Sequence, residues 1–202
     1  VLGVGLPIGV IFLIGLTKFK IEGRGDVEKL TRLPIVGDVP LTAEKTGSIT
    51  VFENQNNLMS ETFRNVRTNL GNGQKVILVT STVSGEGKSF ISANLAVSLS
   101  LLGKKVVIVG LDIRKPGLNK VFNIARKEQG ITQYLSNSEK NLMDLVQASD
   151  VSKSLYILPG GTVPPNPTEL LARDGLDKAI ETLKKNFDYV ILDTAPVGMV
   201  TD

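Results

Sequence analysis

A glycine-rich loop between an apolar run and a helical segment constrains the fold of this chain more than any other feature. Residues 80–89 read TSTVSGEGKS and follow the β-branched run Val76–Thr80. Gly85 and Gly87 permit a tight turn whose backbone N–H groups point inward, toward the place of an anion. A helix that starts at Lys88 would direct the positive end of its dipole at the same place. The sequence therefore predicts a phosphate-binding loop in an α/β fold.

The side chains of this loop follow the pattern GxxxxGK[ST] with one departure. Thr82 stands where the pattern has its first glycine. Lys88 is expected to reach the β- and γ-phosphates of ATP, and the Ser89 hydroxyl to ligate Mg²⁺. The predicted cofactors are therefore ATP and Mg²⁺. The predicted nucleotide-binding residues are Ser84, Gly85, Glu86, Gly87, Lys88, Ser89 and Phe90.

Two aspartates at predicted strand ends complete a candidate metal site. One apolar run, 106–109, is followed by Asp112, and a second, 189–192, by Asp193. Ligands of parallel α/β sheets bind beyond the carboxyl ends of the strands, where the phosphate loop also lies. Two carboxylates and a serine hydroxyl suit Mg²⁺ beside a triphosphate. The predicted metal ligands are Ser89, Asp112 and Asp193, and the predicted catalytic residues are Lys88, Asp112 and Asp193.

Short apolar runs alternate with helical segments from about residue 60 to the end of the chain. The predicted strands are 76–80, 106–109, 156–158 and 189–192. The predicted helices are 60–70, 88–102, 130–148 (broken) and 167–186. This alternation indicates a doubly wound, mainly parallel α/β sheet. With the phosphate loop after its first strand, the expected fold is that of the P-loop NTPases. Tyr156 and Tyr189 fall in predicted strands and are expected in the core.

The amino acids that are missing narrow the chemistry. The 202 residues include no Cys and no His, which excludes thiol nucleophiles, disulfides, imidazole acids or bases and Cys/His zinc sites. There is no Trp, aromatic residues make up 5%, and the net charge is only +3, so we expect no nucleic-acid partner. Carboxylates, hydroxyls, lysines and a hard metal ion are left, and these are the groups that carry phosphoryl transfer.

The N-terminal part of the chain is predicted to join a membrane helix to the P-loop domain. Residues 1–16 are uncharged and apolar, which predicts the end of a transmembrane helix; a buried core helix is the alternative. Five basic side chains against three acids in 17–33 indicate the cytoplasmic side. Residues 17–59 are predicted to form a juxtamembrane linker, in which Asp26 would cap a short helix. Residues 60–202 are predicted to form the P-loop domain, truncated at its C-terminal end.

Taken in order, these motifs resemble the bacterial tyrosine autokinases fused to capsule or exopolysaccharide co-polymerases. The resemblance rests on the loop at 76–89, the acidic strand ends at 106–116 and 190–196, the Pro-rich stretch 158–171, the junction at 24–40, and Glu61-x-x-Arg64-x-x-Arg67. It implies an ATP- and Mg²⁺-dependent protein tyrosine autokinase that regulates polysaccharide biosynthesis and export. The protein would lie in the bacterial inner membrane, with its kinase domain in the cytoplasm.

The resemblance also implies partners. Neighbouring copies of the chain would dock through Glu61, Arg64 and Arg67 and phosphorylate the Tyr-rich tails of adjacent subunits. The polysaccharide polymerase and export machinery would be a further partner. From the residues alone, Glu61 and Arg64 lie on one helix face and could form a local ion pair. The stretch 158–171 has a structural interpretation too, with Asn166 as helix N-cap, and proximity to the base or ribose is the alternative.

Three features depart from the family pattern. Gly110 stands where the second motif usually has its first Asp, so Asp112 becomes the candidate general base or a water-mediated metal ligand. No C-terminal Tyr cluster is present, so the chain is expected to lack its main acceptor tail. Val83 replaces the early lysine of the partitioning and cell-division-site ATPases. Two alternatives stay open: a membrane-tethered P-loop ATPase switch, and a nucleotide-dependent scaffold without protein kinase activity.

Overall fold

The computed structural model describes most of the chain in two units. The described residues are 7, 10, 12, 21, 23–41, 49–52, 57–71, 73, 75–124, 129–137, 140–171 and 174–198. One compact unit comprises Val1–Asp38 and the other Val39–Asp202, and each is described by itself. Nearly all of the predicted membrane segment 1–16 lies outside the described residues. None of the helices in the described part combines the length and apolar character that crossing a membrane requires.

The N-terminal unit contains one described helix, α2 (Arg24–Leu30). Its N-cap is Gly23, so the predicted cap at Asp26 is wrong. Asp26 lies inside the first turn, where its N–H donates to the Gly23 carbonyl at 3.1 Å and its carboxylate faces the positive end of the helix dipole. Arg24 and Glu28 form an ion pair of 2.8 Å on the exposed surface of the helix.

A five-stranded sheet forms the centre of the second unit. Its strands are β1 (Val76–Val79), β2 (Val106–Gly110), β3 (Gln147–Ala148), β4 (Leu155–Leu158) and β5 (Tyr189–Asp193). The order is β1-β5-β2-β4-β3, and every pairing is parallel except that of β3 with β4. Every residue of β2 is buried, as its unbroken apolar sequence requires of a central strand with helices on both faces. The predicted doubly wound, mainly parallel sheet is confirmed.

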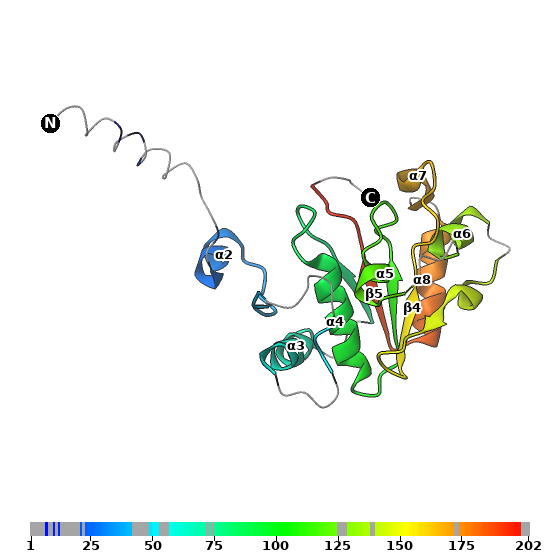
Figure 1. Cartoon of the computed structure of the whole chain (residues 1–202), viewed down its shortest axis with the longest axis horizontal. Helices are drawn as coiled ribbons and strands as arrows, with labels where there is room; N and C mark the ends of the chain where they lie inside the picture. The colour runs from blue at the N-terminus through cyan, green and yellow to red at the C-terminus, as the bar shows by residue number, and fades with distance from the viewer. Residues whose placement is uncertain are drawn as a thin grey trace. The chain divides into compact units, whose positions relative to one another are not determined.

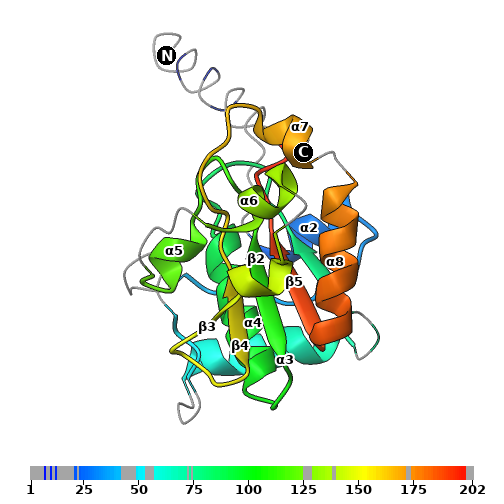
Figure 2. The ribbon, with the colours of Figure 1, turned by 90° about the vertical axis from the view of Figure 1, so that its right-hand side faces the viewer.

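Helices cover both faces of this sheet. They are α3 (Leu58–Asn69), α4 (Lys88–Ser100), α5 (Leu118–Val121), α6 (Ile131–Ser136), the 3₁₀ turn η1 (Leu142–Leu145), α7 (Pro167–Leu171) and α8 (Gly175–Asn186). Helices α3 and α4 lie on one face, while α6 and α8 lie on the other, with the sheet seen between them in Figure 1. Figure 2 looks onto the sheet from the side of α8 and shows β4, β2 and β5 next to one another.

Helix α4 is buried from Ser92 to Ser100. Small side chains dominate it, which lets it approach the sheet and α3 closely. Its Asn94 carboxamide oxygen accepts the backbone N–H groups of Thr50 (2.8 Å) and Val51 (3.1 Å). Thr50 and Val51, within the stretch predicted as a linker, are therefore buried against the helix that follows the phosphate loop.

Several elements differ from the pattern in the sequence. The helical stretch predicted at 167–186 is two helices, since α7 ends at Leu171 and α8 begins at Gly175, with Asp174 as its N-cap. The rings of Tyr156 and Tyr189 are half-buried rather than fully buried. Tyr156 packs edge-on against Phe187 at 5.3 Å between ring centroids, and the Lys105 ammonium lies over its ring. An amphipathic ring of this kind keeps one side toward water.

Candidate active site

The phosphate loop lies between β1 and α4 and takes its shape from two left-handed glycines. Gly85 has φ 95° and Gly87 has φ 88°, a backbone region that side chains with a Cβ avoid. Gly87 is the N-cap of α4, so the free N–H groups of the first helical turn face the loop. No non-glycine residue of the loop adopts positive φ. A glycine at Thr82 is therefore not needed for the turn.

Glu86 holds the first half of the loop with its side chain. Its Oε2 accepts the N–H of Thr82 at 2.7 Å and the N–H of Val83 at 3.2 Å. The Thr82 carbonyl accepts the N–H of Gly198 at 2.9 Å. Glu86 was predicted to bind the nucleotide, and the structure adds a loop-holding role that only the folded backbone reveals.

The structure brings Lys88, Ser89 and both aspartates together. The Lys88 ammonium lies 3.1 Å from Asp193 Oδ1 and 3.4 Å from Asp112 Oδ2. The Ser89 hydroxyl donates to Asp193 Oδ2 at 2.8 Å. A lysine between two carboxylates places one positive charge and two negative charges at the end of the phosphate loop.

The backbone fixes the spacing of the two carboxylates. Strand β2 pairs with β5, and the single carbonyl of Asp193 accepts the N–H groups of both Leu111 (2.8 Å) and Asp112 (2.9 Å). Asp112 in turn accepts the N–H of Lys115 on its Oδ1 at 3.1 Å. Both acidic side chains are therefore placed by hydrogen bonds of the main chain, as a preorganised site requires.

Burial governs the electrostatics of Asp193. Its carboxyl is fully buried, and desolvation raises its pKa above the ordinary value. Lys88, Ser89 and Ser92 act in the opposite direction, because their charge or hydrogen bonds favour the ionised form. Ser92 was not singled out from the sequence. It lies one turn after Lys88 on α4, and its Oγ is 3.2 Å from Asp193 Oδ1.

Gly117 closes the site beside Ser89. A Cβ at position 117 would lie 2.7 Å from Ser89 Oγ, so a glycine is required if this hydroxyl is to keep its place. No local pattern predicts this contact, because the two residues lie 28 positions apart. Gly110, where the family pattern has Asp, is buried, and a Cβ there would meet the Gly160 backbone nitrogen at 3.2 Å. The neighbouring loop thus packs against the backbone of Gly110.

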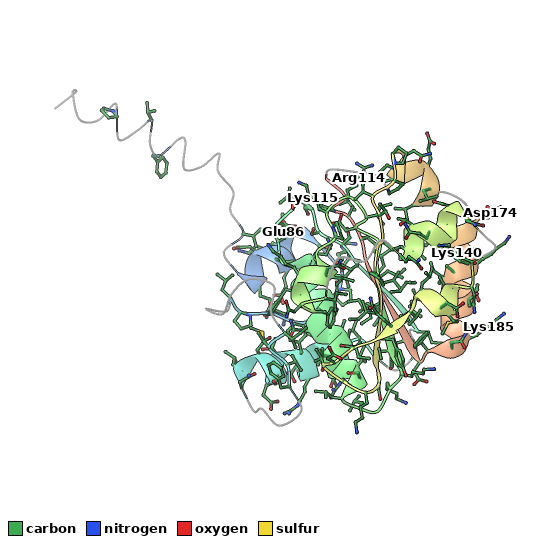
Figure 3. The ribbon with its side chains drawn as sticks, turned by 45° about the vertical axis from the view of Figure 1, so that its right-hand side comes forward. Glu86, Arg114, Lys115, Lys140, Asp174 and Lys185 are labelled. Atoms are coloured by element: carbon green, nitrogen blue, oxygen red, sulfur yellow. The ribbon has the colours of Figure 1, made fainter. Side chains whose placement is uncertain are left out.

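A cavity of about 540 Å³ opens over the loop. A volume of this size suits a small ligand such as a nucleotide. Lys88, Ser89 and Asp112 line it, together with the other predicted nucleotide-binding residues: Ser84, Gly85, Glu86, Gly87 and Phe90. Two lysines that were not predicted, Lys115 and Lys120, line it as well. Figure 3 shows Glu86, Arg114 and Lys115 at this same end of the sheet.

The donor set suits Mg²⁺. Among the described residues, no three acidic side chains cluster to hold a metal by themselves. Ser89, Asp112 and Asp193 offer a hydroxyl and two carboxylates, which are hard oxygen ligands. Mg²⁺ in nucleotide sites typically takes one or two carboxylates and completes its shell with phosphate and water oxygens. The residues present therefore fit this ion.

The predicted docking residues on α3 divide into two kinds. Glu61 and Arg64 form an exposed ion pair. Arg67 turns inward instead, and its guanidinium donates to the Ser98 carbonyl of α4 at 2.6 Å. Burial lowers the pKa of Arg67 from its ordinary value. Arg67 thus joins α3 to the helix that follows the phosphate loop.

The Pro-rich stretch also makes contacts within the fold. The carbonyls of Pro159 and Gly160 accept the N–H groups of Ile131 (2.9 Å) and Thr132 (3.1 Å) at the start of α6. Helix α7 begins at Pro167, and the Asn166 carboxamide donates to the Glu169 carboxylate at 2.8 Å. These bonds agree with the structural interpretation of residues 158–171.

Comparison with known proteins gives one consistent family. The AAA domain family matches residues 74–202. The tyrosine-protein kinase CpsD of Streptococcus agalactiae is 37% identical over 176 residues, which cover 86% of this chain and 70% of that protein. The solved BceF tyrosine kinase domain is 31% identical, with a TM-score of 0.77, and covers 89% of this chain and 78% of its own.

A more distant structure agrees in fold. The septum site-determining protein MinD of Pyrococcus horikoshii, solved in complex with Mg-ADP, is 27% identical, with a TM-score of 0.51, over 59% of this chain and 48% of its own.

Proposed function

The chain belongs to the bacterial tyrosine-protein kinases of the capsule family, and we propose that its Lys88–Asp112–Asp193 site carries out the transfer of the ATP γ-phosphoryl group to tyrosine. It is a protein-tyrosine kinase of the P-loop type that binds nucleotide and Mg²⁺. The observation that supports the site is the position of the Lys88 ammonium, within 3.4 Å of both strand-end carboxylates at the end of a phosphate loop.

Each residue of the site has its own proposed role in binding the nucleotide and the metal ion. The loop N–H groups from Ser84 to Lys88 would hold the phosphate oxygens, and Lys88 would turn from its carboxylate partners toward the β- and γ-phosphates. Ser89, Asp112 and Asp193 would hold Mg²⁺ directly or through water. When bound, Mg²⁺ neutralises charge on the phosphate oxygens and on the leaving group.

Asp112 is the proposed general base. The tyrosine oxygen forms a bond to the γ-phosphorus while the bond from that phosphorus to the β–γ bridging oxygen breaks, and ADP leaves. The phenolic proton passes to the Asp112 carboxylate. Asp112 suits this role better than Asp193, because Asp112 lines the cavity whereas the Asp193 carboxylate is fully buried beneath it.

We place the working protein at the bacterial inner membrane, with the kinase domain in the cytoplasm. Its proposed partners are neighbouring copies, which dock through Glu61, Arg64 and Arg67 and present Tyr-rich tails. The polysaccharide polymerase and export machinery is the further proposed partner. Control of capsule or exopolysaccharide export would follow from phosphorylation of those tails.

Radiolabelled ATP tests the function. The wild-type chain is incubated with Mg²⁺, labelled ATP and a full-length relative made catalytically dead by substitution of its phosphate-loop lysine. Label on the partner's tyrosines supports the kinase, free phosphate alone supports the ATPase switch, and neither supports the scaffold. The variant Asp112→Asn should lower tyrosine labelling by about 100-fold or more, and full activity in that variant would remove Asp112 from the base role.

A further inference from the structure

The residues that line the cavity over the phosphate loop include two lysines without an assigned role. Lys115 lies in the turn after β2, and Lys120 lies on α5. Both side chains are exposed, and both line the cavity over the loop. Within the part of the chain that the structure describes, neither ammonium group has an ion-pair partner.

The other charged groups of the cavity are already engaged. Lys88 lies against Asp112 and Asp193, and the Glu86 carboxylate accepts two loop N–H groups. Among the described residues, the cavity lining contains three cationic and two acidic side chains. The positive excess therefore lies with Lys115 and Lys120, and unpaired cations at a cavity wall attract anions.

The segment that carries the lysines is held in place. The Lys115 N–H donates to Asp112 Oδ1 at 3.1 Å. Gly117 lies against the Ser89 side chain, and Leu118 and Val121, the two ends of α5, are buried. The two lysines thus flank the residue that lies against Ser89. Only their flexible ends are left to adjust to a ligand.

The position of the two lysines favours the acceptor over the nucleotide as the source of the anion. Nucleotide phosphates already have donors of their own, in the loop N–H groups and Lys88. Asp112, the proposed base, must face the acceptor hydroxyl. Lys115 is hydrogen-bonded to that same carboxylate through its backbone, so the lysine-bearing turn begins on the acceptor side of the site.

We propose that Lys115 and Lys120 form an anion subsite that recognises carboxylate or phosphoryl groups next to the acceptor tyrosine. The inference rests on the proposed tyrosine kinase function and names the acceptor class that this site prefers. Acidic tyrosine peptides would bind better than neutral ones, and peptides that already carry a phosphotyrosine would benefit in the same way.

Three synthetic peptides test the subsite. They share one acceptor tyrosine and differ only in flanking Gln, Glu or phosphotyrosine residues, and each is assayed with the chain and saturating Mg-ATP. The KM for the Glu or phosphotyrosine peptide should be about fivefold below that for the Gln peptide, since an exposed ion pair contributes modestly. The double variant K115Q/K120Q should remove this difference while the KM for ATP stays unchanged.

A charge-reversed variant separates recognition from folding. K115E/K120E should prefer a fourth peptide, with Lys residues beside the same tyrosine, which a merely damaged site would not do. The matched control is K104Q/K153Q, because both lysines are exposed and precede β2 and β4, at the opposite end of the sheet. This control should keep the wild-type preference. Circular dichroism should give equal melting temperatures for all variants.

The outcomes identify the source of the anion or reject the subsite. If the wild type prefers the Glu peptide and K115Q/K120Q abolishes that preference, the subsite recognises carboxylates. If the preference is seen only with the phosphotyrosine peptide, the subsite recognises phosphoryl groups. Equal KM values for all peptides with an active wild-type chain overturn the subsite and leave the kinase function standing. A raised KM for ATP in K115Q/K120Q reassigns the lysines to the nucleotide. The absence of any tyrosine transfer by the wild type overturns the proposed function itself.

Discussion

Ion pairs form in two regions of this chain, at the phosphate loop and on α3, and the two regions differ in how far their charged side chains are exposed to water. At the phosphate loop, the Lys88, Asp112 and Asp193 side chains are 8%, 11% and 1% exposed. On α3, the ion-paired Arg64 and Glu61 side chains are 41% and 51% exposed. Water screens the pair on α3, whereas the buried group must neutralise its own charge. Burial, rather than the number of ion pairs, therefore distinguishes the charges of the phosphate-loop site from those on α3.

The two regions also differ in what holds their charges in place. Helix spacing alone brings Glu61 within reach of Arg64 three residues later. Lys88 begins α4, Asp112 follows β2 and Asp193 ends β5, so three separate elements converge at the site. A change at the loop therefore affects several elements, while a change on the surface of α3 affects one.

The largest effect is expected from Lys88→Met. It leaves two carboxylates without their cation and removes the positive charge that would meet the phosphates. Tyrosine transfer should fall by at least about 1,000-fold, and the free energy of unfolding should fall by about 3 kcal/mol. Radiolabel transfer and urea denaturation measure the two effects. The exposed Lys104→Met is the control. An equal loss of unfolding free energy in that variant would show that the Lys88–Asp112–Asp193 ion pairs contribute no more to stability than an exposed lysine does.

A smaller effect on activity is expected from Gly117→Ala. The glycine has φ −80°, so alanine fits the backbone, and the damage comes only from the added methyl group against Ser89 Oγ. The Mg²⁺ concentration for half-maximal transfer should rise about tenfold. Gly73→Ala is the matched control, because a Cβ at position 73 meets nothing within 4 Å. An unchanged Mg²⁺ requirement in Gly117→Ala would count against Ser89 as a metal ligand.

The buried carboxylate should also appear in the pH dependence of stability. Because the folded-state pKa of Asp193 is raised, the native chain binds more protons at this site than the unfolded chain, above the ordinary Asp value of about 3.9. Stability should therefore rise as pH falls through the raised pKa. Denaturation of the metal-free, nucleotide-free chain from about pH 7 down to about pH 4 should show this gain in the wild type relative to Asp193→Asn. Parallel curves for the two proteins would contradict the shift.

The smallest effects are expected on α3, where two arginines can be compared directly. Arg67→Ala loses a charged hydrogen bond to the Ser98 carbonyl and should cost about 1.5 kcal/mol of unfolding free energy. Arg64→Ala loses an exposed ion pair and should cost less than about 0.5 kcal/mol. Thermal denaturation measures both. Sedimentation of each variant then tests docking between copies, and Arg64→Ala should weaken association without destabilising the chain.

Elements with a local signal were predictable from the sequence. The strands β1, β2, β4 and β5 agree with the apolar runs to within one residue, because buried parallel strands need unbroken apolar sequence. Lys88, Ser89, Asp112 and Asp193 could be placed together because parallel strands carry their ligand-binding residues at their carboxyl ends.

The remainder of the site depends on tertiary contacts that leave no mark on the sequence. In the sequence, nothing distinguishes Ser92 from other helical serines. It belongs to the site because the fold brings Asp193 of β5 beside it. Gly117 and Gly198 each face an atom of the phosphate-loop region from a distant part of the chain. The cap at Asp26 was wrong because Gly23 and Asp26 offer competing helix starts, and only the backbone decides between them.

The hydrogen bonds of Leu111 and Asp112 to one Asp193 carbonyl have a consequence for folding. A slip of β5 by one residue would turn the Asp193 side chain to the opposite face of the sheet. We therefore expect nucleotide to bind best to chains in which β2 and β5 have paired in the native register. A ligand that binds one state stabilises that state by mass action. Nucleotide would therefore shift the folding equilibrium toward chains whose sheet has the native strand pairing.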